Sequence, residues 1–224
     1  RAGVQTITFT DGTTQTVTNF VRDAGITVKT LQGSGAAGWN ITKAGAGYIS
    51  VDYFSISRSN ASGATNIWYA GTHSTNGGNN TGWFFIAPDV PTLTVQAATL
   101  IHAEDATGNG TITNLGAGNA SSTSKGVDWG IAPGVYTGSA TTAGAFGLAA
   151  FTQLFTTLPA NDTIYYRVKS QNAVGWGYSA ETSFNTAPIG IPTNVVSTPN
   201  GVLTWITGLY ASDTVVVRGT SEYP

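Results

Sequence analysis

Short runs of alternating hydrophobic and polar residues recur along the whole chain, and each run predicts a β-strand that buries one face. The clearest pair of runs spans Asn161–Thr186, where the turn Asn172–Gly175 carries residue types that tolerate positive φ. Along the first of these strands one face holds Ile164, Tyr166 and Val168, and the other holds Tyr165, Arg167 and Lys169. No window places apolar residues at helical spacing. The pattern therefore predicts an all-β fold.

Residues 1–88 form the first predicted domain. Strands are expected at Gln5–Phe9, Thr16–Phe20, Ile26–Leu31, Trp39–Thr42, Tyr48–Ser57, Asn66–Ala70 and Gly82–Ile86. Strands that return every ~20–25 residues are typical of the coils of a parallel β-helix. The same spacing also fits an antiparallel jelly roll or sandwich, so both architectures remain open for this segment.

Residues 89–187 form the second predicted domain. Strands are expected at Thr92–Val95, Gly108–Asn114, Lys125–Gly130, Phe146–Thr156, Thr163–Gln171 and Tyr178–Asn185. About 100 residues with ~7 short strands is the size of an immunoglobulin-like sandwich. We expect Trp129 to face the opposite sheet. The alternation places Ile164 inside and Tyr165 outside, so Tyr165 is not expected to make the corner hydrogen bond that many such sandwiches contain.

Residues 188–224 form a third, partial module. Strands are expected at Ile191–Val195, Gly201–Trp205 and Asp213–Gly219. Two or three strands cannot bury both of their faces, and an isolated two-stranded ribbon is marginal in water. We expect either that the full protein continues beyond this piece or that a neighbouring chain completes it.

Several short sequence segments resemble parts of known protein modules. The Asn161–Thr186 pair and the run Lys125–Gly130 resemble strands of fibronectin type III and related immunoglobulin-like domains of large bacterial surface proteins and phage tail fibres. The runs Trp39–Ile41, Val51–Ile56 and Gly78–Trp83 resemble a unit of modular surface proteins that often forms the last coils of a right-handed parallel β-helix. These resemblances imply a structural or adhesive segment of a long extracellular, filament-forming or virion-associated protein.

Composition narrows the class of protein. Charged residues make up 9% of the 224 residues, against roughly 25% in an ordinary soluble domain. A surface of hydroxyls and amides is typical of secreted β-proteins, so we expect an extracellular, cell-surface or virion-surface location. The net charge is −2 without a basic run, which leaves nucleic-acid binding without its usual electrostatic signature. There is no cysteine, and no apolar run approaches the ~18 residues of a membrane span.

Residues suited to catalysis are few. The only histidines are His73 and His102, and the acidic candidates are Asp52 and the adjacent pair Glu104 and Asp105, for which an exposed turn is expected. No nucleophile elbow, phosphate loop or metal-ligand spacing is present. We therefore expect no enzymatic activity, no cofactor and no metal.

Aromatic side chains offer the best candidates for binding. Trp68, Tyr69 and Trp83 flank a polar loop rich in Asn and Thr, and exposed aromatic planes stack on sugar rings. These three residues are the predicted glycan-stacking site if the chain is instead a carbohydrate-binding module attached to a larger secreted protein. The expected partners are neighbouring protein subunits or modules, with glycans under this second interpretation.

Overall fold

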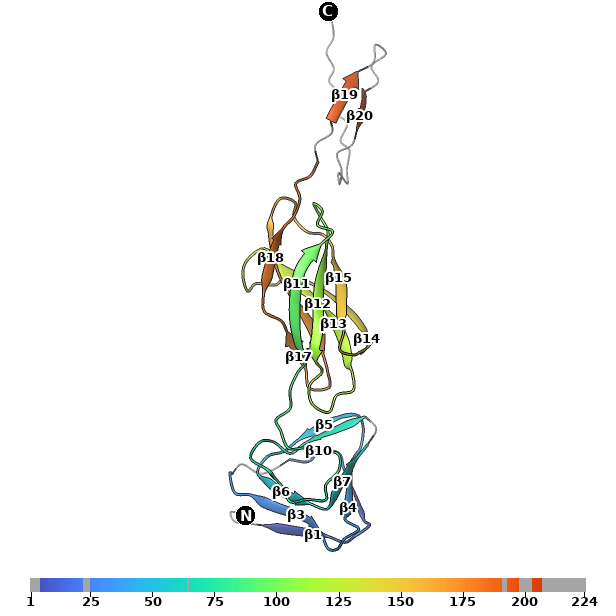
Figure 1. Ribbon diagram of the computed structural model, residues 1–224, viewed down its shortest axis with the longest axis vertical. Helices are drawn as coiled ribbons and strands as arrows, with labels where there is room; N and C mark the ends of the chain where they lie inside the picture. Colours follow the sequence, from blue (N-terminus) through green and yellow to red (C-terminus); the bar gives the residue numbers. More distant parts are fainter. Residues whose placement is uncertain (1–4, 22–24, 64, 191–192, 198–202, 207–224) are drawn as a thin grey trace, which may run out of the picture.

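The computed structural model describes residues 5–21, 25–63, 65–190, 193–197 and 203–206. The described part contains strands and turns without a helix, which confirms the all-β fold class. Accordingly, no described segment forms a helix long and apolar enough to cross a membrane. Figure 1 shows two β-rich units in succession, followed by a short hairpin.

The first unit is a parallel β-helix with three sheets. Its strands are β1 (Thr6–Phe9), β3 (Lys29–Gly33), β6 (Phe54–Ser57) and β9 (Thr75–Asn76) in one sheet; β2 (Thr14–Val17), β4 (Trp39–Lys43) and β7 (Ser59–Ser62) in the second; and β5 (Gly47–Ser50), β8 (Asn66–Tyr69) and β10 (Trp83–Phe84) in the third. Every strand pair in these sheets is parallel. A jelly roll would need antiparallel pairs, so the β-helix is the alternative that the structure selects. Figure 1 shows the triangular outline of the coils.

The coils return at the expected spacing. Thr6 pairs with Thr30, Thr30 with Ser55 and Ser55 with Thr75, which gives intervals of 24, 25 and 20 residues. Equivalent residues therefore stack in columns along the coils. Inward columns fill the core with the buried side chains Leu31, Trp39, Ile41, Ile49, Val51, Phe54, Ile56, Trp68 and Trp83.

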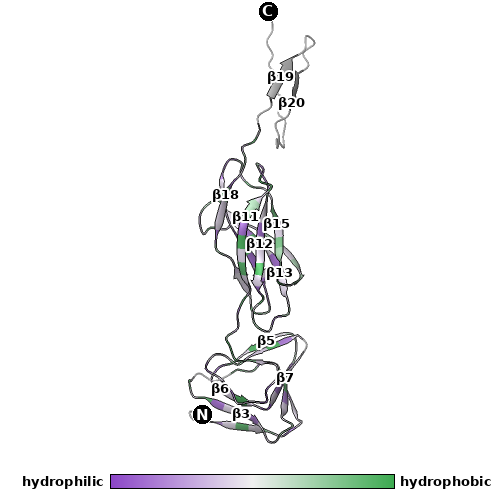
Figure 2. Cartoon of the chain, viewed as in Figure 1, coloured by the Kyte–Doolittle hydropathy of each residue, from purple (hydrophilic) through white to green (hydrophobic). Residues whose placement is uncertain are grey.

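The second unit is a sandwich of two antiparallel sheets. One sheet holds β11 (Thr92–Thr99), β12 (Ala106–Asn114) and β15 (Ala150–Phe155). The other holds β14 (Gly138–Phe146), β13 (Ser122–Gly130) and β16 (Thr163–Gln171), with β17 (Trp176–Tyr178) and β18 (Thr182–Asn185) both pairing with β16. Hydrophobic and hydrophilic bands alternate along β11 and β12 in Figure 2, as expected for strands that bury one face.

The alternation predicted for β16 is confirmed. Ile164, Tyr166 and Val168 are each 0% exposed and belong to the sandwich core. Tyr166 donates a hydrogen bond from its hydroxyl to the Gln96 carbonyl 2.5 Å away, and burial raises the pKa of this phenol to about 12. The inward tyrosine thus bonds the facing sheet, and Trp129 packs edge-on against Phe155 at 5.3 Å between ring centroids.

The chain leaves the sandwich through residues 186–190 and forms the antiparallel pair β19 (Thr193–Ser197) and β20 (Leu203–Ile206). These two strands overlap the expected runs Ile191–Val195 and Gly201–Trp205. The third expected strand, Asp213–Gly219, lies outside the described residues.

Candidate functional site

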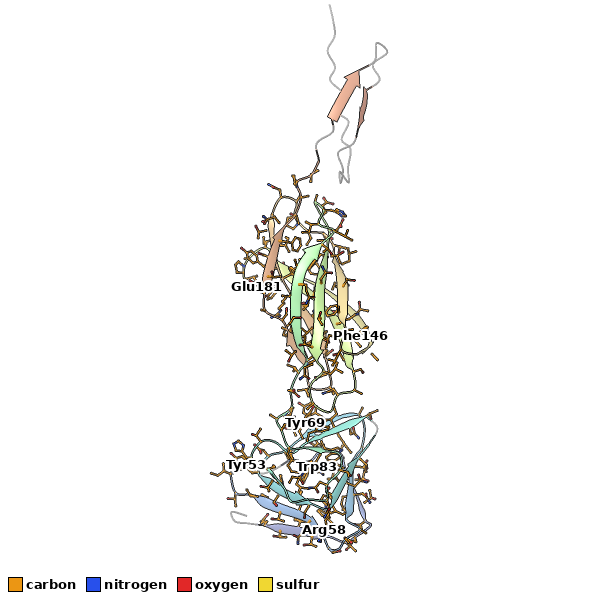
Figure 3. All side chains as sticks on the ribbon, in the orientation of Figure 1. Tyr53, Arg58, Tyr69, Trp83, Phe146 and Glu181 are labelled. Carbon is orange, nitrogen blue, oxygen red and sulfur yellow. The ribbon has the colours of Figure 1, made fainter. Side chains whose placement is uncertain are left out.

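The three predicted glycan-stacking residues are buried. Trp68 is 1%, Tyr69 0% and Trp83 9% exposed, and Figure 3 shows Trp83 inside the triangle of coils. Their polar atoms are also satisfied within the protein, since Trp83 donates its indole N–H to the Ser59 hydroxyl at 2.9 Å. The expectation that these rings face solvent is therefore corrected, because no ring face is open to a sugar.

The three rings have two different roles. Trp68 and Trp83 point into the β-helix, where they pack together at 5.3 Å between ring centroids. Tyr69 follows Trp68 on the same strand and so points outward from the wall. It is nevertheless fully buried, because the loop between β12 and β13 of the sandwich covers it: the Tyr69 hydroxyl donates to the Ala117 carbonyl at 2.5 Å. This contact defines a joint between the two units, seen at Tyr69 in Figure 3.

Hydrogen bonds fix the connecting segment within this joint. The Asp89 carboxylate accepts the Ala117 backbone N–H at 2.8 Å. The Asn172 side chain donates to the carbonyls of Asp89 at 2.8 Å and Leu115 at 3.0 Å. The linker is thus tied at Asp89 to both neighbouring loops of the sandwich, and the Tyr69–Ala117 hydrogen bond connects the first of these loops to the β-helix.

Close packing completes the joint at Gly118. A Cβ atom on this residue would lie 2.6 Å from the Phe84 ring and 2.7 Å from the Ile67 side chain, both on the outer wall of the β-helix. Gly118 also has φ +77°, in the left-handed region that favours glycine. Only a residue without a side chain lets the loop approach the wall this closely.

His73 and Asp52, which are 21 residues apart, form a pair on one corner of the β-helix. His73 Nδ1 lies 2.7 Å from Asp52 Oδ2, and the His73 backbone N–H donates to Oδ1 at 2.8 Å. The Tyr53 ring stacks on the imidazole at 4.6 Å between centroids. Burial acts to raise the pKa of Asp52, but the hydrogen bonds from His73 and Tyr53 outweigh it and hold the pKa below its usual value.

This pair lacks the third member of a hydrolytic triad in the described structure. The hydroxyl in hydrogen-bond range of the His73 ring belongs to Thr72, and it meets Nδ1, the nitrogen that Asp52 already engages. A nucleophile would have to contact the other ring nitrogen. The arrangement ties the polar loop to the coil below it.

The remaining acidic candidates lie on the sandwich. Asp105 Oδ1 lies 2.6 Å from His102 Nδ1, within one turn of chain. Glu104 contributes its backbone carbonyl to the Leu158 N–H at 2.9 Å. Both acids lie between β11 and β12, where Glu104 is exposed and Asp105 is half-buried. Among the residues that the structure describes, no three His, Asp or Glu side chains gather closely enough to hold a metal ion.

A buried charge cluster that the sequence did not predict lies on the outer face of β13 and β16. Asp128 is 7% and Lys169 8% exposed, and Lys169 Nζ lies 2.5 Å from Asp128 Oδ1 and 2.7 Å from the Ser139 hydroxyl. Arg167 adds a contact to Asp128 Oδ2 at 3.2 Å. Its guanidinium lies against the Tyr136 and Tyr178 rings, 4.2 and 3.7 Å from their centroids.

The comparisons with known proteins give weak similarities. No protein-family model and no curated protein matches the chain. Two structures of the sensor domain of the anti-sigma factor RsgI4 from Pseudobacteroides cellulosolvens are 16% identical to it. One covers 45% of this chain and 97% of its own length with a TM-score of 0.34, and the solution structure covers 60% and 96% with a TM-score of 0.38.

A third similar structure is the chitinase ChiW from Paenibacillus sp. str. FPU-7, a cell-surface-expressed multi-modular enzyme. It is 11% identical, and the match covers 83% of this chain and 20% of the chitinase with a TM-score of 0.26. Similarity at this level carries no argument about function.

Proposed function

We propose that the chain is a structural or adhesive segment of a long extracellular, filament-forming or virion-associated surface protein. Its partners are neighbouring protein subunits or modules, and its place is the cell surface or the virion surface. The observation that carries this proposal is the joint between the β-helix and the sandwich, where Tyr69, Asp89 and Asn172 hold the two units in one orientation. A fixed joint is what a spacer needs to present other modules at a set distance.

The surface and the cores support the same role. A chain with 9% charged residues and no cysteine depends on buried apolar side chains and backbone ladders for its stability. Both units have such cores, centred on Trp68 in the β-helix and on Phe155 in the sandwich. Because the chain has no cysteine, neither core relies on a disulfide, which suits a segment exposed outside the cell or particle.

The joint can be tested by measuring the distance between the units. Because the chain has no cysteine, cysteines introduced at the exposed positions Thr16 and Leu148 would carry the only spin labels. We expect a narrow distance distribution by pulsed electron paramagnetic resonance. Gly118→Ala should broaden it, since the new methyl group would meet Phe84 and Ile67.

Gly45→Ala is the matched control for this experiment. Gly45 has the same φ of +77° as Gly118, but a Cβ there would meet no atom within 4 Å. The control therefore has equal backbone strain without a wedge in the joint, and its distance distribution should stay narrow. A broad distribution in the unmodified chain would refute the rigid spacer.

The location can be tested separately. Antibodies against the purified chain should label the outside of unpermeabilised cells of the source, or of its particles, in immunogold electron microscopy. Labelling only after permeabilisation would rule out a surface segment.

A further inference from the structure

One corner of the β-helix carries a left-handed residue in every coil. The register pairs Thr14 with Asn40, Asn40 with Asn60 and Asn60 with Thr81. Two positions before each of these residues lie Gly12, Gly38, Arg58 and Asn79, with φ values of 73°, 71°, 53° and 57°. The column is thus occupied by glycine in two coils, and by residues with polar side chains in the next two.

Arg58 stands out in this column. A left-handed conformation is strained for a non-glycine residue, and glycine at the same position would avoid that strain. The Arg58 side chain is exposed and makes no hydrogen bond or ion pair within the described residues. Lys43, in the same β-helix, instead donates to three backbone carbonyls. Strain at a residue with an unengaged charge points to a ligand.

Two adjoining clefts flank Arg58 and Asn79. Their volumes are about 380 and 390 Å³, within the range of ~300–1,000 Å³ that is usual for ligand sites. Arg58 and Asn79 line both clefts. The remaining polar side chains of the linings are Thr8, Gln32, Ser34 and Ser57 in the first and Asn60 and Thr81 in the second.

The charge balance of these linings favours an anion. Among the described residues, neither lining contains a carboxylate. The nearby Asp11 is turned toward the loop between β3 and β4 of the next coil, where it accepts the backbone N–H groups of Gly35 at 2.7 Å and Ala37 at 2.9 Å. The Arg58 guanidinium therefore offers its donors to solvent between two clefts of amides and hydroxyls. Figure 3 shows Arg58 at this corner, on the side of the β-helix away from the sandwich.

We propose that this corner binds an acidic oligosaccharide, with Arg58 holding the carboxylate or sulfate of one sugar. A guanidinium fork matches a planar carboxylate in bidentate geometry. Amides and hydroxyls on both sides suit the hydroxyl groups of neighbouring sugars. A single cation matches one negative charge per contact, and the polar linings do not suit an apolar peptide side chain. This inference assigns a ligand class, and it stands whether or not the segment is a rigid spacer.

The test measures binding of a galacturonic acid hexamer to the complete chain by isothermal titration calorimetry. The fully methyl-esterified hexamer, a sulfated galactose hexamer and inorganic phosphate serve as comparison ligands. We expect binding of the acidic hexamers, and a loss of at least about tenfold in affinity for Arg58→Gln, since a charge-assisted hydrogen bond contributes about 1.5–3 kcal/mol. Lys43→Gln removes the same charge from another part of the β-helix and should bind within about twofold of the unmodified chain.

Each possible result either supports or overturns the proposal. Binding of either acidic hexamer that depends on Arg58 supports the proposal, and the two acids distinguish a uronic from a sulfated sugar. Equal binding of the esterified hexamer, equal loss in both variants, binding of phosphate alone, or no binding overturns it. Arg58→Gly provides a second variant that relieves the backbone strain, so a loss of binding there cannot be ascribed to misfolding.

Discussion

Removal of the Asp128 carboxylate should destabilise the sandwich strongly. In Asp128→Ala, Lys169 would keep the Ser139 hydroxyl at 2.7 Å and the Trp176 ring, 5.0 Å from its centroid, but it would lose its anion. Lys169 is 8% exposed, and removing one partner of a buried ion pair costs about 3–5 kcal/mol. Arg167 adds little to this loss, because it is more exposed and stays between two tyrosine rings. The expected loss is a large part of the ~5–15 kcal/mol by which a domain is stable.

The assay is urea unfolding monitored by tryptophan fluorescence and by hydrogen exchange. Exchange at the β13 and β16 amides reports the stability of the sandwich separately from that of the β-helix. The double variant Asp128→Leu with Lys169→Met replaces both charges by apolar groups. It should recover most of the loss, because it removes the desolvation cost of both ions. Asp105→Ala is the control, since it removes an exposed partner of His102 and should change the free energy of unfolding by less than about 1 kcal/mol.

Two results would refute this reasoning. A cost below about 1 kcal/mol for Asp128→Ala would mean that the Lys169 ammonium reaches water through its flexible stem. A double variant less stable than the single one would mean that the cluster stabilises the fold beyond its desolvation cost.

Four further outcomes are expected. Because burial raises the Tyr166 pKa to about 12 from 10.0, its stabilisation should be complete below pH 10 and be lost as the pH rises toward 12; Tyr166→Phe should flatten this loss in an alkaline denaturation series. Asp52 has a lowered pKa, so its contribution to the free energy of unfolding should be complete above pH 3.8 and be lost as the pH falls below that value. In an acid-unfolding series, Asp52→Asn should lack this pH-dependent loss of stability. Gly82→Ala should cost more than about 1 kcal/mol in thermal unfolding, because its φ is +74° and the new Cβ would lie 2.0 Å from the Ala61 carbonyl oxygen. Arg58→Gly should raise the free energy of unfolding by about 1 kcal/mol in the same assay. An unchanged or lower melting temperature would contradict the inference that the left-handed backbone of Arg58 is strained.

Local patterns predicted the faces of single strands well. On β16 the alternation identified Ile164, Tyr166 and Val168 as core, because one face of that strand packs against the opposite sheet. The same rule places Trp68 and Tyr69 on opposite faces of β8. It could not show that Tyr69 is buried by another unit, since burial of an outward face depends on a partner far away in the sequence.

Non-local pairings were harder to predict. Alternation has the same period in parallel and antiparallel strands, so it cannot distinguish a β-helix from a jelly roll, which differ in how their strands pair. Asp52 and His73 show no sign of a pair in the sequence, although one coil of about 20 residues brings them together. The left-handed residues Gly12, Gly38, Arg58 and Asn79 recur at unequal intervals of 26, 20 and 21 residues, so this column too became visible only in the structure.

The burial of Tyr69 also determines how the molecule can be extended. The sandwich sits on the side wall formed by β5, β8 and β10 (Figure 1), not on the end of the stack of coils. The sandwich therefore projects sideways from the β-helix, roughly perpendicular to the direction in which its coils stack. Coils added before β1 would lengthen the β-helix without moving the sandwich. Modules added after β18 would extend the molecule from the sandwich without disturbing the β-helix. Side-wall attachment thus makes the two directions of growth independent of each other.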